Sequence, residues 1–185
     1  SLTLISPQHF LITTHSAPAA GATVSFLNQA GVVKTFTVDS TYHVTHSPGV
    51  DTDITIGRLS APIASSDLIT SYPILSLNSY AEYLNLPLLV YGANGRVGQN
   101  TLDTLMLTDM LPFGGGNGTV DSVLFRTDLD PVSGQPQGET GDSGSPTLYI
   151  SGSTLALLGI HSALDSAPAL DLTYDSFIPS YASQI

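Results

Sequence analysis

The chain has 185 residues, 42% of them hydrophobic, which is enough for one sizeable core or for two small cores packed together. Acidic residues outnumber basic ones by 15 to 4, and this balance argues against nucleic acid or an anionic membrane surface as partner, because both need clustered Lys and Arg. The absence of cysteine excludes disulfides, thiolate catalysis and cysteine metal sites.

Short apolar or alternating segments bounded by Gly, Pro, Asn and Asp predict strands along most of the chain. The expected strands are 2–6, 10–14, 23–27, 32–38, 54–59, 86–91, 101–107, 122–127, 147–150 and 155–161. The alternation continues to Val44, which predicts a long hairpin arm. A short helix is predicted over 177–184, with Asp175 and Ser176 as its cap.

Many short strands with little helical periodicity predict an all-β sandwich or barrel. The segment 66–85 is looser, and we expect it to connect an N-terminal half, 1–65, to a C-terminal half, 86–185. The chain begins as if in the middle of a strand and carries no signal peptide, so we expect a mature or trimmed fragment. Its Lys-poor, Ser- and Thr-rich composition suits a secreted protein.

The segment GETGDSGSPTLYI, residues 138–150, places Asp142 and Ser143 between glycines, directly before an apolar strand. A serine hydroxyl is a weak nucleophile that needs a base, a group to orient the base, and donors for an oxyanion. His15 ends a predicted strand and is followed by a small residue. Asp53 directly precedes the alternating strand 54–59, and Asp51 is the rival acid two residues earlier.

Several segments resemble the chymotrypsin-like serine proteases in the chain order of that family. Those that contain the three candidates are HFLITTHS with His15, DTDITIGRL with Asp53 and GDSGSP with Ser143. In addition, LLGIHSA at 157–163 is similar to the strand that lines the substrate cleft, and YDSFIPSYASQI is similar to the closing strand-to-helix segment. The resemblance therefore spans nearly the whole chain.

The resemblance implies an all-β fold of two packed antiparallel barrels of the six-stranded type, with a short C-terminal helix. It implies a serine endopeptidase in which Ser143 attacks the acyl carbon, His15 takes its proton and Asp53 fixes the imidazole. The N–H groups of Gly141 and Ser143 would form the oxyanion hole. We expect no cofactor and no metal, a protein or peptide substrate, no nucleic acid or membrane partner, and a monomer.

The sequence departs from the family in three places. Only fourteen residues precede His15, so we expect the first barrel to lack a strand or to take it from elsewhere. In the animal digestive enzymes the counterpart of Asp142 pairs with a new N-terminal amine, which Ser1 does not resemble; Asp142 then needs another partner, or upstream sequence is missing. Ser145 stands in place of the usual second Gly, as in several bacterial and viral members.

By the same resemblance, the substrate pocket is bounded by 137–142, 160–164 and part of the strand near 171–174, with its base near Gln137 and Gly138 and with Thr140 and Ser162 in its wall. Residue 137 is not Asp, so cleavage after Lys or Arg is not expected.

His161 stands where glutamate-specific relatives carry a His that contacts the substrate carboxylate, which predicts recognition of Glu or Gln. The alternative is a packed strand histidine satisfied by a backbone group. The net charge of -11 and the neighbouring Glu139 count against an acidic substrate.

Two other functions are alternatives to a serine endopeptidase. One is a catalytically inactive or zymogen-like binding module on the same fold, which an intact set of His15, Asp53 and Ser143 disfavours. The other is a serine esterase of the α/β-hydrolase type, which needs the order Ser, Asp, His and a strand–turn–helix around the serine. Here His comes first and strands dominate.

Overall fold

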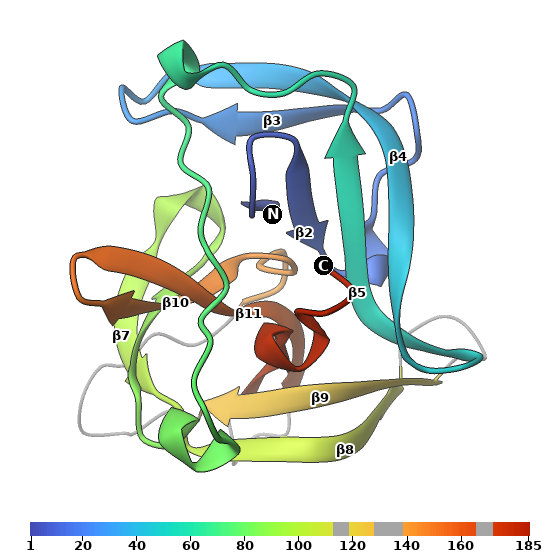
Figure 1. The fold of residues 1–185 in the computed structure, drawn as a ribbon, viewed down its shortest axis with the longest axis vertical. Coiled ribbons are helices and arrows are strands. Elements are labelled where there is room, and N and C mark those ends of the chain that lie inside the picture. The colour runs from blue at the N-terminus through green and yellow to red at the C-terminus, as the bar shows by residue number, and fades with distance from the viewer. Residues whose placement is uncertain (113–118, 128–138, 166–171) are drawn as a thin grey trace.

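The structure is a computed structural model that describes residues 1–112, 119–127, 139–165 and 172–185. Its described residues form two curled antiparallel sheets (Figure 1), which confirms the predicted all-β fold. The first sheet has the order β1-β2-β5-β4-β3, with bounds Thr3–Leu4, His9–Ile12, Val50–Leu59, Val33–Ser47 and Thr23–Leu27. The second has the order β7-β6-β10-β11-β12-β9-β8, with bounds Val97–Thr101, Pro87–Tyr91, Pro146–Ser151, Thr154–Asp165, Leu172–Phe177, Thr119–Thr127 and Thr104–Pro112.

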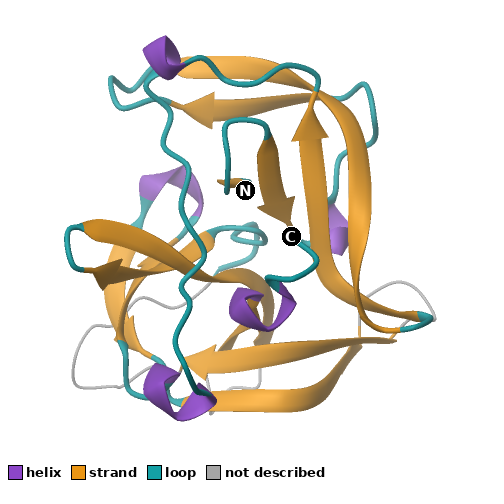
Figure 2. Cartoon of the chain, in the orientation of Figure 1, coloured by secondary structure: helices purple, strands orange, loops and turns teal. Residues whose placement is uncertain are grey.

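The helical segments are short 3-10 turns between the strands (Figure 2). They are η1 (Thr14–Ser16), η2 (Ser65–Asp67), η3 (Tyr80–Tyr83), η4 (Ala93–Gly95) and η5 (Ile178–Tyr181). Within the described ranges, no helix is long and apolar enough to cross a bilayer. The chain between β5 and β6, which carries η2 and η3, connects the two sheets.

Side chains of β2 pack into two different hydrophobic cores. Phe10 and Ile12 are buried in the core of the first sheet, whereas Leu11 between them is buried with the core of the second sheet. Successive residues of a strand point to opposite faces, so β2 is covered on both sides. Consequently the residues that follow β2, among them His15, start from the border between the sheets.

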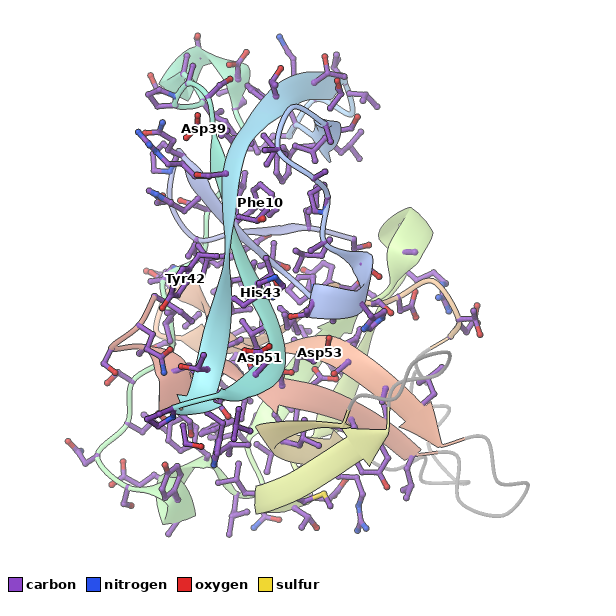
Figure 3. The ribbon with its side chains drawn as sticks, turned by 90° about the vertical axis from the view of Figure 1, so that its right-hand side faces the viewer. Phe10, Asp39, Tyr42, His43, Asp51 and Asp53 are labelled. Carbon is purple, nitrogen blue, oxygen red and sulfur yellow. The ribbon has the colours of Figure 1, made fainter. Side chains whose placement is uncertain are left out.

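The hairpin of β4 and β5 is longer than the sequence predicted, because β4 continues to Ser47 and β5 begins at Val50. The pairing of the two strands shifts register at three places, between Val38 and Ser47. Such bulges bend and twist a strand pair. The hairpin thus runs from the first core, near Phe10, down to the second sheet, where β5 packs against β9 and where Asp53 lies (Figure 3).

Three sequence predictions were wrong in detail. The strands predicted from sequence patterns omitted β7, whose segment VGQNT carries few apolar residues, and joined its end to β8. They also omitted β12, for which the resemblance predicted a strand near 171–174. The predicted helix over 177–184 is the single 3-10 turn η5, which follows β12 directly. Asp175 and Ser176 do not cap it; both are buried within β12, where tertiary partners outweigh their local preference for a cap. Among the described residues the first sheet has five strands and the second has seven, and β1 and β2 are the strands that precede His15.

Gly57 of β5 lies directly against the ring of Phe10. A Cβ atom at this position would come within 2.0 Å of Phe10 Cζ, and Phe10 is fully buried. We predict that Gly57→Ala lowers the free energy of unfolding by about 1–3 kcal/mol, the usual effect of overpacking a core. Urea unfolding measures this change. Ser25→Ala on the exposed face of β3 is the control, expected within about 0.5 kcal/mol of wild type. Equal stability of Gly57→Ala and wild type would contradict this packing.

Candidate active site

Three side chains from separate segments meet at the border of the two sheets. His15 lies in η1, Asp53 in β5, and Ser143 in the turn before β10. His15 Nε2 lies 2.9 Å from Ser143 Oγ, and His15 Nδ1 lies 3.1 and 3.2 Å from the two carboxylate oxygens of Asp53. The imidazole therefore bridges a carboxylate and a hydroxyl, the arrangement in which it can accept the hydroxyl proton.

The turn that carries His15 is fixed to β5 by hydroxyl contacts. Thr14 Oγ1 donates to the carbonyl of Thr52 at 3.1 Å and lies 3.0 Å from Thr55 Oγ1. The backbone N–H of His15 faces Asp53 Oδ1 at 3.4 Å. These contacts, made with β5 residues on both sides of Asp53, anchor η1 to β5. The position of the imidazole relative to the carboxylate is therefore fixed by β5.

Asp53 is fully buried, and its donors come from both sheets. Besides His15, the hydroxyl of Ser162 on β11 donates to Asp53 Oδ2 at 2.5 Å. An unpaired buried charge is costly, and these donors supply the hydrogen bonds that the carboxylate would otherwise receive from water. The resemblance predicted Ser162 only as a residue of the pocket wall. Its contact with Asp53 was not predicted, because the two residues are 109 positions apart and no sequence pattern near either one indicates the other.

The pKa of His15 is raised above its ordinary value of 6.5. The main cause is the hydrogen bond that the ring donates to the Asp53 carboxylate, which outweighs the partial burial of the ring. The pair therefore favours the protonated imidazole that would form after proton transfer from Ser143.

The turn around Ser143 leaves two N–H groups without a partner. Among the described residues, neither the N–H of Gly141 nor that of Ser143 donates a hydrogen bond, whereas Asp142 N–H donates to Glu139 O. Gly141 has a φ of 102° and Gly144 a φ of 79°, values that residues with a Cβ rarely adopt. Free N–H groups beside a nucleophile are the donors that an oxyanion requires.

Asp142 faces away from solvent, 2% exposed, and its partner is Arg96. Arg96 Nη2 lies 2.8 and 2.9 Å from the two carboxylate oxygens, and the N–H groups of Ala93 and Glu139 donate at 2.7 and 2.8 Å. Burial acts to raise the pKa of Asp142, but these two N–H groups and the guanidinium outweigh it and hold the pKa below its ordinary value. The sequence predicted the need for a partner without identifying it, because Arg96 lies 46 residues away.

A cavity of about 190 Å³ opens beside Ser143. It is lined by 139–143 and 161–164, so Thr140, His161 and Ser162 of the predicted pocket border it. Gln137 and Gly138, predicted at its base, lie outside the described residues. No group of three or more His, Asp or Glu side chains in the described part of the chain is arranged to hold a metal ion.

His161 is 4% exposed and is held at both ring nitrogens. Nδ1 lies 2.5 Å from Asp175 Oδ1 on β12, and Nε2 lies 3.0 Å from the carbonyl of Tyr91. Because both partners are acceptors, both nitrogens donate only in the imidazolium form. Burial acts to lower the pKa of His161, but the charge and hydrogen bond of Asp175 outweigh it and raise the pKa. His161 is thus a packed strand residue that also borders the cavity beside Ser143.

No protein-family model and no curated protein matches the chain. Among solved structures, the protease domain of MamO from Magnetospirillum magneticum aligns with 98% of this chain and 85% of its own, at 14% identity and a TM-score of 0.61. The murine norovirus NS6 protease, solved as an inactive chimera with a cysteine-to-alanine substitution, aligns with 95% of this chain and 86% of its own, at 16% identity and a TM-score of 0.58. These likenesses show that the chain has the chymotrypsin-like protease fold of two antiparallel barrels.

We predict that an NMR titration gives His15 a pKa above 6.5 and that Asp53→Asn lowers it. The amide retains a hydrogen-bond acceptor but removes the charge that stabilises the imidazolium. Asp51→Asn is the matched control, since Asp51 lies two residues away on the same strand with an exposed side chain and should leave the titration of His15 unchanged. An equal effect of both substitutions would show that the pair does not set this pKa.

Proposed function

We propose that the protein is a serine endopeptidase that cleaves peptide bonds through an acyl-enzyme on Ser143. The observation that carries the proposal is the continuous contact from Ser143 Oγ through the His15 imidazole to the Asp53 carboxylate. The fold alone leaves the nucleophile open, since one similar structure was inactivated by replacing a cysteine. This chain contains no cysteine, and a serine stands at the turn.

In the proposed reaction, Ser143 Oγ forms a bond to the carbonyl carbon while His15 Nε2 accepts the hydroxyl proton. The carbonyl oxygen becomes an oxyanion that accepts from the N–H groups of Gly141 and Ser143. The C–N bond then breaks as His15 returns the proton to the leaving amine. Water then attacks the acyl carbon while His15 accepts its proton, and the ester bond to Ser143 Oγ breaks as His15 returns that proton to the oxygen.

The alternative is a catalytically inactive or zymogen-like binding module on the same fold. Such a module has no need for a serine hydroxyl 2.9 Å from an imidazole, or for the N–H groups of Gly141 and Ser143, which have no acceptor among the described residues. The peptidase proposal uses all of these features. Proposed localisation is extracellular, on composition alone.

We predict that a fluorophosphonate probe labels Ser143 once and that His15→Ala reduces the labelling rate at least about a thousandfold, because the hydroxyl loses its base. Intact-protein mass spectrometry measures the adduct. Ser145→Ala is the matched control: its buried hydroxyl has no partner in the described residues, so the variant should fold and be labelled normally. Absence of labelling in the folded wild type would favour the binding module.

For the substrate, we propose Glu or Gln before the scissile bond. His161 borders the cavity beside Ser143 and would carry a positive charge below its raised pKa, and the Thr140 hydroxyl would be a second donor to a side-chain oxygen. Glu139, which would repel an acidic side chain, is paired with Arg96 at 2.6 Å. The net charge of -11 acts at longer range, where salt screens it beyond roughly 8–10 Å.

The contact of His161 Nε2 with Tyr91 limits how a substrate could bind. A substrate carboxylate would share this N–H with the carbonyl or replace it, whereas the positive charge acts in either arrangement. The proposed preference therefore depends on the charge of His161 more than on a single hydrogen bond.

We predict that kcat/KM is higher for Glu than for Gln, and higher for both than for Leu or Lys. His161→Gln should reduce kcat/KM for Glu substrates by about ten- to a thousandfold, the range for losing a charged partner. Because the pKa of His161 is raised, its charge is present at low pH, and the Glu-to-Gln ratio should fall as pH rises through that pKa.

Peptide-library profiling measures these preferences, with His9→Gln on β2 as the control. Hydrolysis of a small, unspecific ester should change little, because the nucleophile and its base remain. A preference for large apolar residues that survives in His161→Gln would overturn the carboxylate proposal and leave the role of Ser143 standing.

A further inference from the structure

We propose that Thr3 is a positioning residue that sets the placement of Ser143 relative to His15, because its hydroxyl joins the turn around Ser143 to the hairpin that leads to His15. The proposal rests on the peptidase function proposed above. It gives a role in the reaction to a buried threonine of the first sheet, whose side chain bonds the residue after Ser143.

Two successive carbonyl groups of the turn around Ser143 accept hydrogen bonds from the segment that contains β1. The Ser143 carbonyl accepts from Ser1 N at 2.7 Å, and the Gly144 carbonyl accepts from Thr3 Oγ1 at 3.0 Å. In the described part of the chain, no other donor reaches either carbonyl. The first sheet therefore orients the two peptide planes that follow Ser143, although the turn leads into β10 of the second sheet.

The contact between this segment and Gly144 is close and dry. A Cβ atom at Gly144 would come within 2.3 Å of the carbonyl oxygen of Ser1. Thr3 is 1% exposed and Gly144 is buried as well, so water has little access to replace the hydroxyl. Without that hydroxyl, the Gly144 carbonyl would be a buried acceptor with no donor, which is costly enough to make the turn shift toward another partner.

The hairpin that holds the turn also leads to the base. In the ladder of β1 and β2, Thr3 lies opposite Leu11 (Figure 1). β2 ends at Ile12, and the chain then enters η1, which carries His15. Thr3 thus lies across one pair of strands from a residue four positions before His15. Ser143 and His15 are 128 residues apart in the sequence, yet a single hairpin connects them in space.

A small shift of the turn would act directly on the reacting groups. His15 Nε2 lies 2.9 Å from Ser143 Oγ, and a misplacement of about 1 Å at such a contact reduces a rate on the order of a hundredfold. The contact of His15 with Asp53 depends on β5 instead. Loss of the Thr3 hydroxyl should therefore lower the reactivity of Ser143 and leave the titration of His15 unchanged.

Thr13 offers a matched control in the same part of the fold. Its side chain is fully buried, and its hydroxyl has no hydrogen-bond partner among the described residues. Thr3→Val and Thr13→Val each replace one buried hydroxyl by a methyl group of similar size, but Thr3→Val alone removes a donor from the turn around Ser143. Thr3→Ser keeps the donor and removes a methyl group.

The test compares wild type, Thr3→Val, Thr3→Ser and Thr13→Val by steady-state kinetics, fluorophosphonate labelling and an NMR titration of His15. We expect Thr3→Val to lower kcat and the labelling rate on the order of 10- to 100-fold, with little change in KM. Thr3→Ser should recover most of both rates, and Thr13→Val should match wild type. Equal losses in Thr3→Val and Thr13→Val, or in Thr3→Val and Thr3→Ser, would overturn the role of the hydroxyl.

Two readouts separate this role from a general loss of stability. Thermal unfolding gives the transition of each variant, and rates measured well below it refer to folded protein. The charged groups that face His15 are Asp53 and the amino group of Ser1, and the substitutions change neither. The pH profile of Thr3→Val should therefore keep the midpoint of wild type and reach a lower plateau.

The outcomes distinguish this proposal from the proposed function. If folded wild type is not labelled at Ser143, the proposed function fails. If wild type is labelled and Thr3→Val reacts at the same rate, the role of Thr3 is overturned while the peptidase stands. A shifted titration of His15 in Thr3→Val would also overturn it, since the hydroxyl would then act on the base. If Thr3→Val does not fold, Thr3→Ala removes the same donor, and a rate equal to wild type would overturn the proposal.

Discussion

A single buried carboxylate connects the two sheets of this protein. Asp53 belongs to the first sheet and receives hydrogen bonds from His15 in the first half of the chain and from Ser162 on β11 of the second sheet. Because a buried charge that loses its donors is strongly destabilising, the sheets cannot separate or slide at this point without a large cost in free energy. The relative placement of Ser143 and His15 depends on that constraint.

The same physical rule applies at the other buried acids. In the described residues, Asp53, Asp142 and Asp175 are the buried carboxylates, and each lies beside a group that can carry positive charge: His15, Arg96 and His161. Only 10% of the chain is charged, yet these three pairs surround one turn. The described part of the chain therefore places its buried carboxylates around Ser143, and the other buried polar residues, apart from His161, are uncharged Ser, Thr and Asn.

Local patterns predicted the all-β fold. They also identified His15, Asp53 and Ser143 as candidate site residues, because each lies in a short segment of distinctive sequence. The remaining contacts had no such signal. Asp175 precedes an apolar stretch, and this pattern predicted a helix cap. In the structure its carboxylate bonds Thr147 and His161 within the second sheet. Likewise, nothing near Asp142 in the sequence indicates Arg96, since that pair forms only when the segment after β6 and the turn around Ser143 come together in the fold.

The contacts that build the site have a kinetic consequence, because they join residues that are far apart along the chain. Thr3 reaches Gly144, His15 reaches Ser143 and Asp53 reaches Ser162, across 141, 128 and 109 residues. Long-range pairing of this kind gives a high contact order and slow folding, since large loops must close before their contacts stabilise anything. A chain emerging from the ribosome would present His15 and Asp53 long before β11 exists to complete them. The candidate site around Ser143 is therefore expected to assemble late, and a chain that ends before β11 lacks it.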